Sequence, residues 1–169
     1  MVLGFAQRAP IGFAADRRGE LQVARGNAAD LASELQSEPQ AYAKIIDGTA
    51  ALKRGDARSA IKALKEANEL QDTWIGHFQL ARAYLEAGLF VEADSEFDRC
   101  IKRRGEALSL FLDQVPTFGY FPSVYYYQGR VREGLKSSGF ADSYRTYLGI
   151  RGQPGEDPLL PEVHRRLGQ

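Results

Sequence analysis

Histidine and cysteine, the side chains that serve most readily as general base and as activated nucleophile, are scarce in this chain. The sequence holds two histidines, His77 and His164, and a single cysteine, Cys100. A hydrolase of the Ser/His/Asp type needs a histidine that contacts a nucleophile and is itself oriented, and neither histidine lies in a recognisable nucleophile motif. We expect His77 to be a packed or half-exposed histidine and Cys100 to behave as a small buried hydrophobe. An enzyme remains an alternative, because sequence distance alone does not exclude convergence in space.

The usual motifs for metals and phosphates are also absent. The sequence contains no Walker loop, no GxGxxG after a strand and no His-Glu-x-x-His. Four acidic residues alternate along one predicted helix and therefore point around it rather than toward one ion: Glu92, Asp94, Glu96 and Asp98. A basic run fits the solvated outer side of the same helix, with a docking patch for acidic protein or phosphate as the alternative: Arg99, Lys102, Arg103 and Arg104. We expect no cofactor and no metal, and a single cysteine excludes an internal disulfide.

Composition sets the broad class of protein. Of the 169 residues 44% are hydrophobic and 26% are charged, which is too apolar for a disordered chain. Basic and acidic residues both number 22, so the chain lacks the global basic field of a typical nucleic-acid binder. No apolar run approaches the roughly 18 residues of a membrane span, and Met1–Phe13 lacks the pattern of a secretion signal. We therefore expect a soluble, cytoplasmic protein that binds neither nucleic acid nor membrane.

The elements that position these residues follow from an internal repeat. When Ala41–Thr73 is laid over Trp74–Glu106, small residues fall on small ones and bulky apolar residues on bulky ones. The matched pairs are Gly48 with Ala81, Gly55 with Gly88, Ala60 with Ala93, Leu64 with Phe97 and Ala67 with Cys100. Each copy holds two helical patterns that break at a glycine, which predicts a helix–turn–helix unit.

The helical prediction is independent of that alignment. Within Trp74–Ala87 and again within Phe90–Ile101, apolar residues recur in steps of three and four, which marks one buried face of a helix. Neither segment has an internal proline. Gly88 between them can adopt a left-handed conformation and so end the first helix.

These spacings resemble the tetratricopeptide repeat, whose signature is Trp-x2-Leu-Gly-x2-Tyr followed by Ala-x3-Phe. The second copy has His77-x2-Leu80-Ala81-x2-Tyr84 and then Ala93-x3-Phe97. The first copy matches more loosely, with Lys44-x2-Asp47-Gly48-x2-Ala51 and then Ala60-x3-Leu64. A third begins near Pro122, with Tyr125-x2-Gln128-Gly129 and later Gly139-Phe140-Ala141, and there Tyr144 follows Ala141 by three positions, so its hairpin or register differs. The resemblance implies an all-α, right-handed α-solenoid of about three such units.

On this interpretation residues 1–169 form a single array. Its predicted parts are a degenerate helical pair (12–40), two repeats (41–73 and 74–107), a helix extension with an aromatic loop (108–121), a third repeat (122–150) and a tail with a capping helix (151–169). The extension is expected over Arg104–Asp113. In the tail, Asp157 is a candidate N-cap with Pro158 at the first helical position, and Leu159, Leu160, Val163 and Leu167 form the expected apolar side.

The resemblance places a concave groove on the first helix of each repeat. Its expected lining residues are Tyr42, Ile45, Thr49 and Lys53 in the first repeat, Phe78, Gln79, Arg82 and Glu86 in the second, and Tyr126, Tyr127 and Arg130 in the third. Aromatic anchors with isolated arginines are typical of a protein-binding surface. Arg82 and Arg130 occupy equivalent positions and could bind a partner carboxylate. The alternative is that they only form helical pairs such as Arg82 with Glu86.

We therefore expect a non-catalytic module that binds a peptide or protein whose identity the sequence does not reveal. Tetratricopeptide domains that clamp the C-terminus of heat-shock chaperones carry Lys, Asn and Arg where this chain has Ile45, Thr49, Gln79, Ser123 and Tyr127, so that subtype is not expected. Trp74–Leu167 also resembles tetratricopeptide segments of large bacterial signalling proteins, in which case the chain is a fragment or a stand-alone relative of such a protein. The alternative function is self-assembly into a homodimer through Phe118–Pro122 and Tyr125–Tyr127.

Overall fold

The computed structural model describes residues 18–32, 37–109, 121–151 and 157–168. These residues form helices and turns without a strand, which confirms the predicted all-α class. The helices are α1 (Arg18–Ala32), α2 (Ser37–Lys53), α3 (Ala57–Leu70), α4 (Trp74–Glu86), α5 (Phe90–Lys102), α6 (Arg104–Ser109), α7 (Ser123–Gly134), α8 (Phe140–Arg151) and α9 (Leu160–Arg166). Within this part of the chain, no helix combines the length and the apolar character needed to cross a bilayer.

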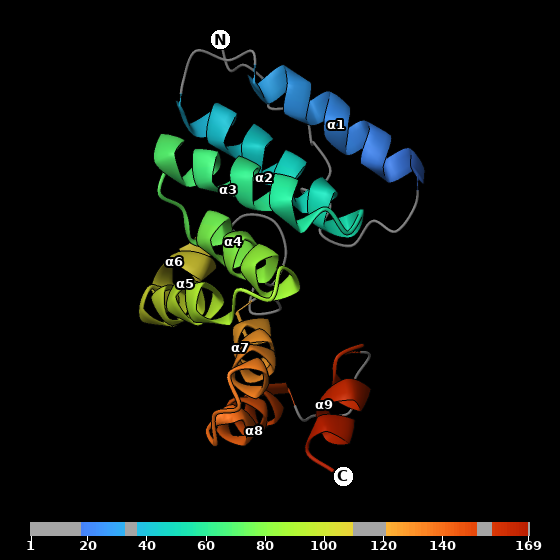
Figure 1. The fold of residues 1–169 in the computed structure, drawn as a ribbon. Helices are drawn as coiled ribbons and strands as arrows, with labels where there is room; N and C mark the ends of the chain where they lie inside the picture. The colour runs from blue at the N-terminus through green and yellow to red at the C-terminus, as the bar shows by residue number, and fades with distance from the viewer. Residues whose placement is uncertain (1–17, 33–36, 110–120, 152–156, 169) are drawn as a thin grey trace.

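The helices pack in chain order (Figure 1). α2 packs against α3, α3 against α4 and α4 against α5. α5 packs against α7, and not against the short α6 that separates the two in the sequence. The first helices of the three hairpins also meet one another, since α2 contacts α4 and α4 contacts α7. α1 packs on α2 at one end, and α9 packs on α8 at the other. The first helices of the hairpins thus contact one another in succession.

The helix bounds reproduce the 33-residue period. Lys53 and Glu86, the last residues of α2 and α4, are 33 positions apart, as are Ala57 and Phe90, the first residues of α3 and α5. Gly55 and Gly88 have φ of 79° and 74°, a left-handed conformation that glycine adopts without steric cost. This confirms the prediction that a glycine ends each first helix.

A small residue faces a bulky one where the two helices of a hairpin cross. A Cβ atom built on Gly48 would lie 2.5 Å from Leu64 Cγ, and one on Gly129 would lie 2.5–2.8 Å from the ring of Tyr144. Leu64 and Tyr144 have no exposed surface. The close approach of the helices therefore depends on the absent side chains, and the bulky partner fills the space that they leave.

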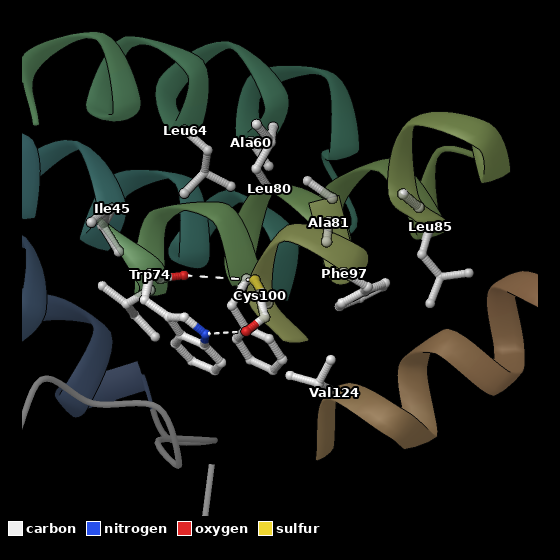
Figure 2. Close-up of a cluster of buried hydrophobic side chains, with 14 of the residues drawn as sticks. Ile45, Ala60, Leu64, Trp74, Leu80, Ala81, Leu85, Phe97, Cys100 and Val124 are labelled. Atoms are coloured by element: carbon white, nitrogen blue, oxygen red, sulfur yellow. Dashed lines mark hydrogen bonds between the residues drawn. The ribbon is translucent and has the colours of Figure 1, made fainter. Parts of the chain in front are cut away.

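The middle hairpin is closed by Trp74 and Cys100 (Figure 2). Trp74 Nε1 donates to the backbone oxygen of Cys100 at 2.9 Å, and Cys100 Sγ lies 3.9 Å from the backbone oxygen of Trp74. Cys100 is buried, as expected, and burial raises the pKa of its thiol. Both effects, burial and the raised pKa, disfavour the thiolate that a reactive cysteine needs.

Some helix bounds differ from the expected ones. The described part of region 12–40 holds α1 and the first residues of α2, which begins at Ser37, and residues 12–17 and 33–36 lie outside the described residues. The helix after α5 is separate, since backbone pairing ends at Arg103 and α6 starts at Arg104. Residues 110–113 of that extension, and residues 115–120 of the aromatic loop, lie outside the described residues.

The tail helix α9 starts later than the sequence suggested. Asp157 does act as a cap, since its Oδ1 accepts from the backbone N–H of Leu159 at 3.0 Å. It caps a turn, however, and Pro158 lies in that turn rather than at the first helical position. The proline near the start of α9 is Pro161. The expected apolar side is confirmed, because Val163 is buried beside Leu159, Leu160 and Leu167.

Candidate functional site

The predicted groove residues divide into an accessible group and a buried group. Tyr42, Arg82, Tyr127 and Arg130 are half-buried, and Lys53 and Glu86 are exposed. Ile45, Thr49, Phe78, Gln79 and Tyr126 are buried. The structure therefore brings six of the eleven to positions where another molecule could touch them, and it places the other five in the interior.

Each buried residue has an internal role that explains its position. The Phe78 ring stacks on Trp74 with a centroid distance of 5.3 Å and meets the edges of Phe97 and Tyr127. Thr49 Oγ1 donates to the backbone oxygen of Ile45 at 2.7 Å. These groups complete the core between helices. Their role is therefore internal packing, and the expectation that they contact a partner directly does not fit their burial.

Arg82 of α4 rests on aromatic rings. Its guanidinium carbon lies 5.1 Å from the ring centroid of Tyr127 and 6.0 Å from that of Phe78, within the range of a cation–π contact. Its Nη1 donates to Gln79 Oε1 at 3.0 Å. The contacts hold the guanidinium between α4 and α7 and point to a fixed rather than a freely moving side chain.

The alternative pairing of Arg82 with Glu86 does not form. Glu86 instead accepts from Arg130 Nη1 at 3.1 Å, which joins α4 to α7. The two arginines at equivalent repeat positions therefore differ in their surroundings. We call Arg82, Glu86, Tyr127 and Arg130 together the α4–α7 face.

His77 is buried at the junction of α3, α4 and α5. Its Nδ1 lies 2.6 Å from Glu96 Oε2, and its Nε2 lies 2.8 Å from Asp72 Oδ1. Asn68 and Arg99 approach the ring at 3.4 Å. The histidine thus contacts carboxylates, as a catalytic histidine does. A catalytic histidine must also be accessible to a substrate, however, and only 5% of the His77 side chain is exposed. The ring is a packed histidine, as expected.

The acidic residues of α5 face different neighbours. Glu96 contacts His77, Asp98 accepts from Gln128 at 3.0 Å, and Asp94 lies 3.8 Å from Arg132. Burial raises the pKa of Asp94, and nearby Asp98 adds to this while Arg132 opposes it. In the described ranges no three acidic, histidine or cysteine side chains gather as a metal site would require.

The basic run at the end of α5 is only partly a solvated surface. Arg99, Lys102 and Arg104 are exposed. Arg103 is half-buried and binds Asp72 and Glu106. Its hydrogen bond lowers the pKa of Asp72 against the opposing effect of burial. This ion pair ties the loop before α4 to α6.

Sequence reasoning missed the polar attachment of α9. Tyr126 donates to Glu162 Oε2 at 2.8 Å, and Tyr147 donates to Asp157 Oδ2 at 2.6 Å. Arg166 of α9 pairs with Glu133 of α7 and with Glu162 at 2.6 Å. The signal in the sequence was the excess of tyrosines in α7 and α8, because a buried tyrosine needs a partner for its hydroxyl group. His164 of the same helix is exposed.

The surface expected for self-assembly is partly internal. Phe121 packs on Trp74 at 6.4 Å and on Tyr125 at 5.6 Å, and Tyr127 stacks on Phe97 at 6.0 Å. These aromatic rings are engaged within the chain.

No family model, curated protein or solved structure matches this sequence.

Proposed function

We propose that the chain is a tetratricopeptide-like α-solenoid that acts as a non-catalytic interaction module. The helix order supports this arrangement, because each hairpin packs on the next and the first helices α2, α4 and α7 contact one another in succession. The 33-residue spacing of helix ends and the glycine at each of the first two turns support it as well. A stack of this kind presents side chains from several helices on one continuous side.

The observation that carries the functional proposal is the α4–α7 face. Arg82 and Tyr127 are half-buried and held by contacts between two hairpins, while Arg130 and Glu86 bridge the same helices. Rigid aromatic and arginine side chains lose little conformational freedom when a partner binds, which favours them as anchors. The partner we propose is a peptide or a protein segment that lies across this face.

Peptide selection from a displayed random library tests the proposal. The immobilised chain should enrich related sequences, and the double variant Arg82→Glu with Arg130→Glu should lose them while its helical circular dichroism stays unchanged. The matched control is Lys62→Glu with Lys65→Glu, which makes the same charge change at exposed positions of α3. Enriched peptides that bind both double variants alike would contradict a site on the α4–α7 face.

A further inference from the structure

Half-buried arginines in this chain normally have a carboxylate partner. Among the arginine side chains that the structure describes, six are half-buried: Arg82, Arg103, Arg130, Arg132, Arg151 and Arg166. Five of these lie within 4 Å of an Asp or Glu oxygen. Arg103 pairs with Asp72 and Glu106, Arg130 with Glu86, Arg132 with Asp94, Arg151 with Asp157, and Arg166 with Glu133 and Glu162. Among the lysines in the described ranges, Lys44 is the half-buried one, and it pairs with Glu66. Arg82 is the exception.

Among the described residues, Arg82 contacts only neutral groups. The rings of Tyr127 and Phe78 and the amide oxygen of Gln79 surround its guanidinium. Gln79 itself is completely buried, and its Nε2 has no hydrogen-bond partner in the described part of the chain. Its amide is therefore oriented with the oxygen on Arg82, an arrangement that positions the guanidinium and leaves most of its N–H donors unused.

The nearest acidic residue along the helix already pairs with another arginine. Glu86 lies one turn after Arg82 on α4, where an (i, i+4) pair would be favourable, but its carboxylate bonds Arg130 at 3.1 Å. A cation that is partly removed from water and has no counter-charge attracts an incoming anion more strongly than an exposed one does. Within the described ranges the charge of Arg82 is thus unmatched, and it favours a negative group from another molecule.

We propose that Arg82 is the anchor for an Asp or Glu side chain of the partner segment, an inference that rests on the proposed function. The forked guanidinium can donate two parallel hydrogen bonds to one carboxylate. On the neighbouring turn, the Glu86–Arg130 pair offers an acceptor and a donor to the backbone of a chain that continues past this point. That continuity favours an acidic side chain within the segment over a terminal carboxylate. Tyr127 forms the apolar wall beside it.

Titration of the isotope-labelled full chain with small probes tests the anchor directly by NMR. N-acetyl-aspartate N-methylamide should shift the Arg82 Nε–Hε signal saturably, whereas the uncharged asparagine analogue should not. N-acetylglycine, which carries a terminal carboxylate, should bind at least several-fold more weakly. The variant Arg82→Met should lose the response, and Arg58→Met, which removes an exposed arginine of α3, should retain it.

Each result has a defined meaning. Equal shifts with the aspartate and asparagine probes, or a response that survives in Arg82→Met, would overturn the anchor, and so would tighter binding of N-acetylglycine. If selected peptides bind the α4–α7 face without an acidic residue at a constant position, the anchor is wrong while the interaction module stands. If the aspartate probe binds Arg82 and no peptide is enriched, Arg82 is a carboxylate site but the proposed function fails, and the partner anchor fails with it.

Discussion

The hairpins α2–α3 and α4–α5 and the region α7–α9 use the same packing with different chemistry. In the first region each hairpin loop has three residues with glycine in the left-handed position, and the bulky partners are Leu64 and Phe97. In the second region the loop has five residues, Lys136 takes the left-handed position, and the buried rings belong to tyrosines. A small residue still faces a large one at Gly129. The comparison separates what the architecture requires from what is free to vary.

Tyrosine changes the requirements of the second region. A buried hydroxyl group without a partner costs about 1–3 kcal/mol, so Tyr126 and Tyr147 need acceptors, and Glu162 and Asp157 supply them from the C-terminal segment. Burial raises the pKa of both tyrosines, and their carboxylate acceptors add to the effect. The first region is therefore stabilised mainly by apolar packing, whereas the second depends also on hydrogen bonds to α9 and the turn before it.

The largest expected difference between the regions comes from filling their small positions. Gly129→Ala places a methyl group against the rigid Tyr144 ring, and overpacking of this kind costs about 1–3 kcal/mol. Gly48→Ala meets the fully buried Leu64, with its Cγ at 2.5 Å. An aliphatic branch can change rotamer, which a planar ring cannot do to the same effect, so the cost should be smaller. Urea unfolding monitored by circular dichroism would rank the two variants.

Gly149→Ala is the matched control for this ranking. Gly149 lies in α8, and among the described residues outside its own helical turn no atom lies within 4 Å of the position where its Cβ would be. Alanine should therefore stabilise the helix by about 0.5–1 kcal/mol. If Gly48→Ala proves as costly as Gly129→Ala, the rigidity of the facing ring is not what distinguishes the regions.

Much of the first region could be predicted from sequence because its signals are local. Periodic apolar residues and a glycine between them determined α4 and α5 almost to the residue. The accessible surface was harder to predict, since Phe78 and Gln79 lie on the expected side of α4 but are buried by side chains from other helices. Helical position indicates a direction from the axis, and burial depends on what packs there in three dimensions.

The polar contacts could not be predicted from the sequence for a related reason. Glu86 lies at the right spacing to pair with Arg82, yet Arg130, 44 positions later, is its partner. The helical rule concerns neighbours on one helix, whereas the actual choice depends on the approach of α7 to α4. The same reason applies to Tyr126 and Glu162, which are brought together only when α9 folds back.

The attachment of α9 should respond to acid. Burial raises the pKa of Glu162, but hydrogen bonds from Tyr126 and Arg166 outweigh it and bring the pKa below the ordinary 4.5. A carboxyl group with a lowered pKa contributes stability above about pH 4.5, and this is lost as the pH falls through the folded-state value. At neutral pH Glu162→Gln should therefore cost about 1 kcal/mol, and the difference from the native chain should shrink below pH 4.5.

Thermal unfolding at several pH values measures this difference. Glu92→Gln serves as the control, because Glu92 is exposed on α5 in the first region, and such a change should alter stability by less than about 0.5 kcal/mol at any of these pH values. A gap between native and Glu162→Gln chains that stays constant down to pH 3 would show that the carboxylate does not stabilise the second region.

The smallest expected effect tests the loop that distinguishes the third hairpin. Lys136 has φ of 54°, a conformation that costs a residue with a side chain about 1–2 kcal/mol. Glycine removes that strain but gives the unfolded chain more freedom, which offsets about 0.5–1 kcal/mol. Lys136→Gly should therefore stabilise the chain by about 0.5–1 kcal/mol. Ser138→Gly, in the same loop without a positive φ, should be neutral or slightly destabilising in the same urea titration. Equal effects of the two substitutions would mean that the backbone of this loop is not strained at Lys136, and that the third hairpin, unlike those that turn at Gly55 and Gly88, has no need for glycine.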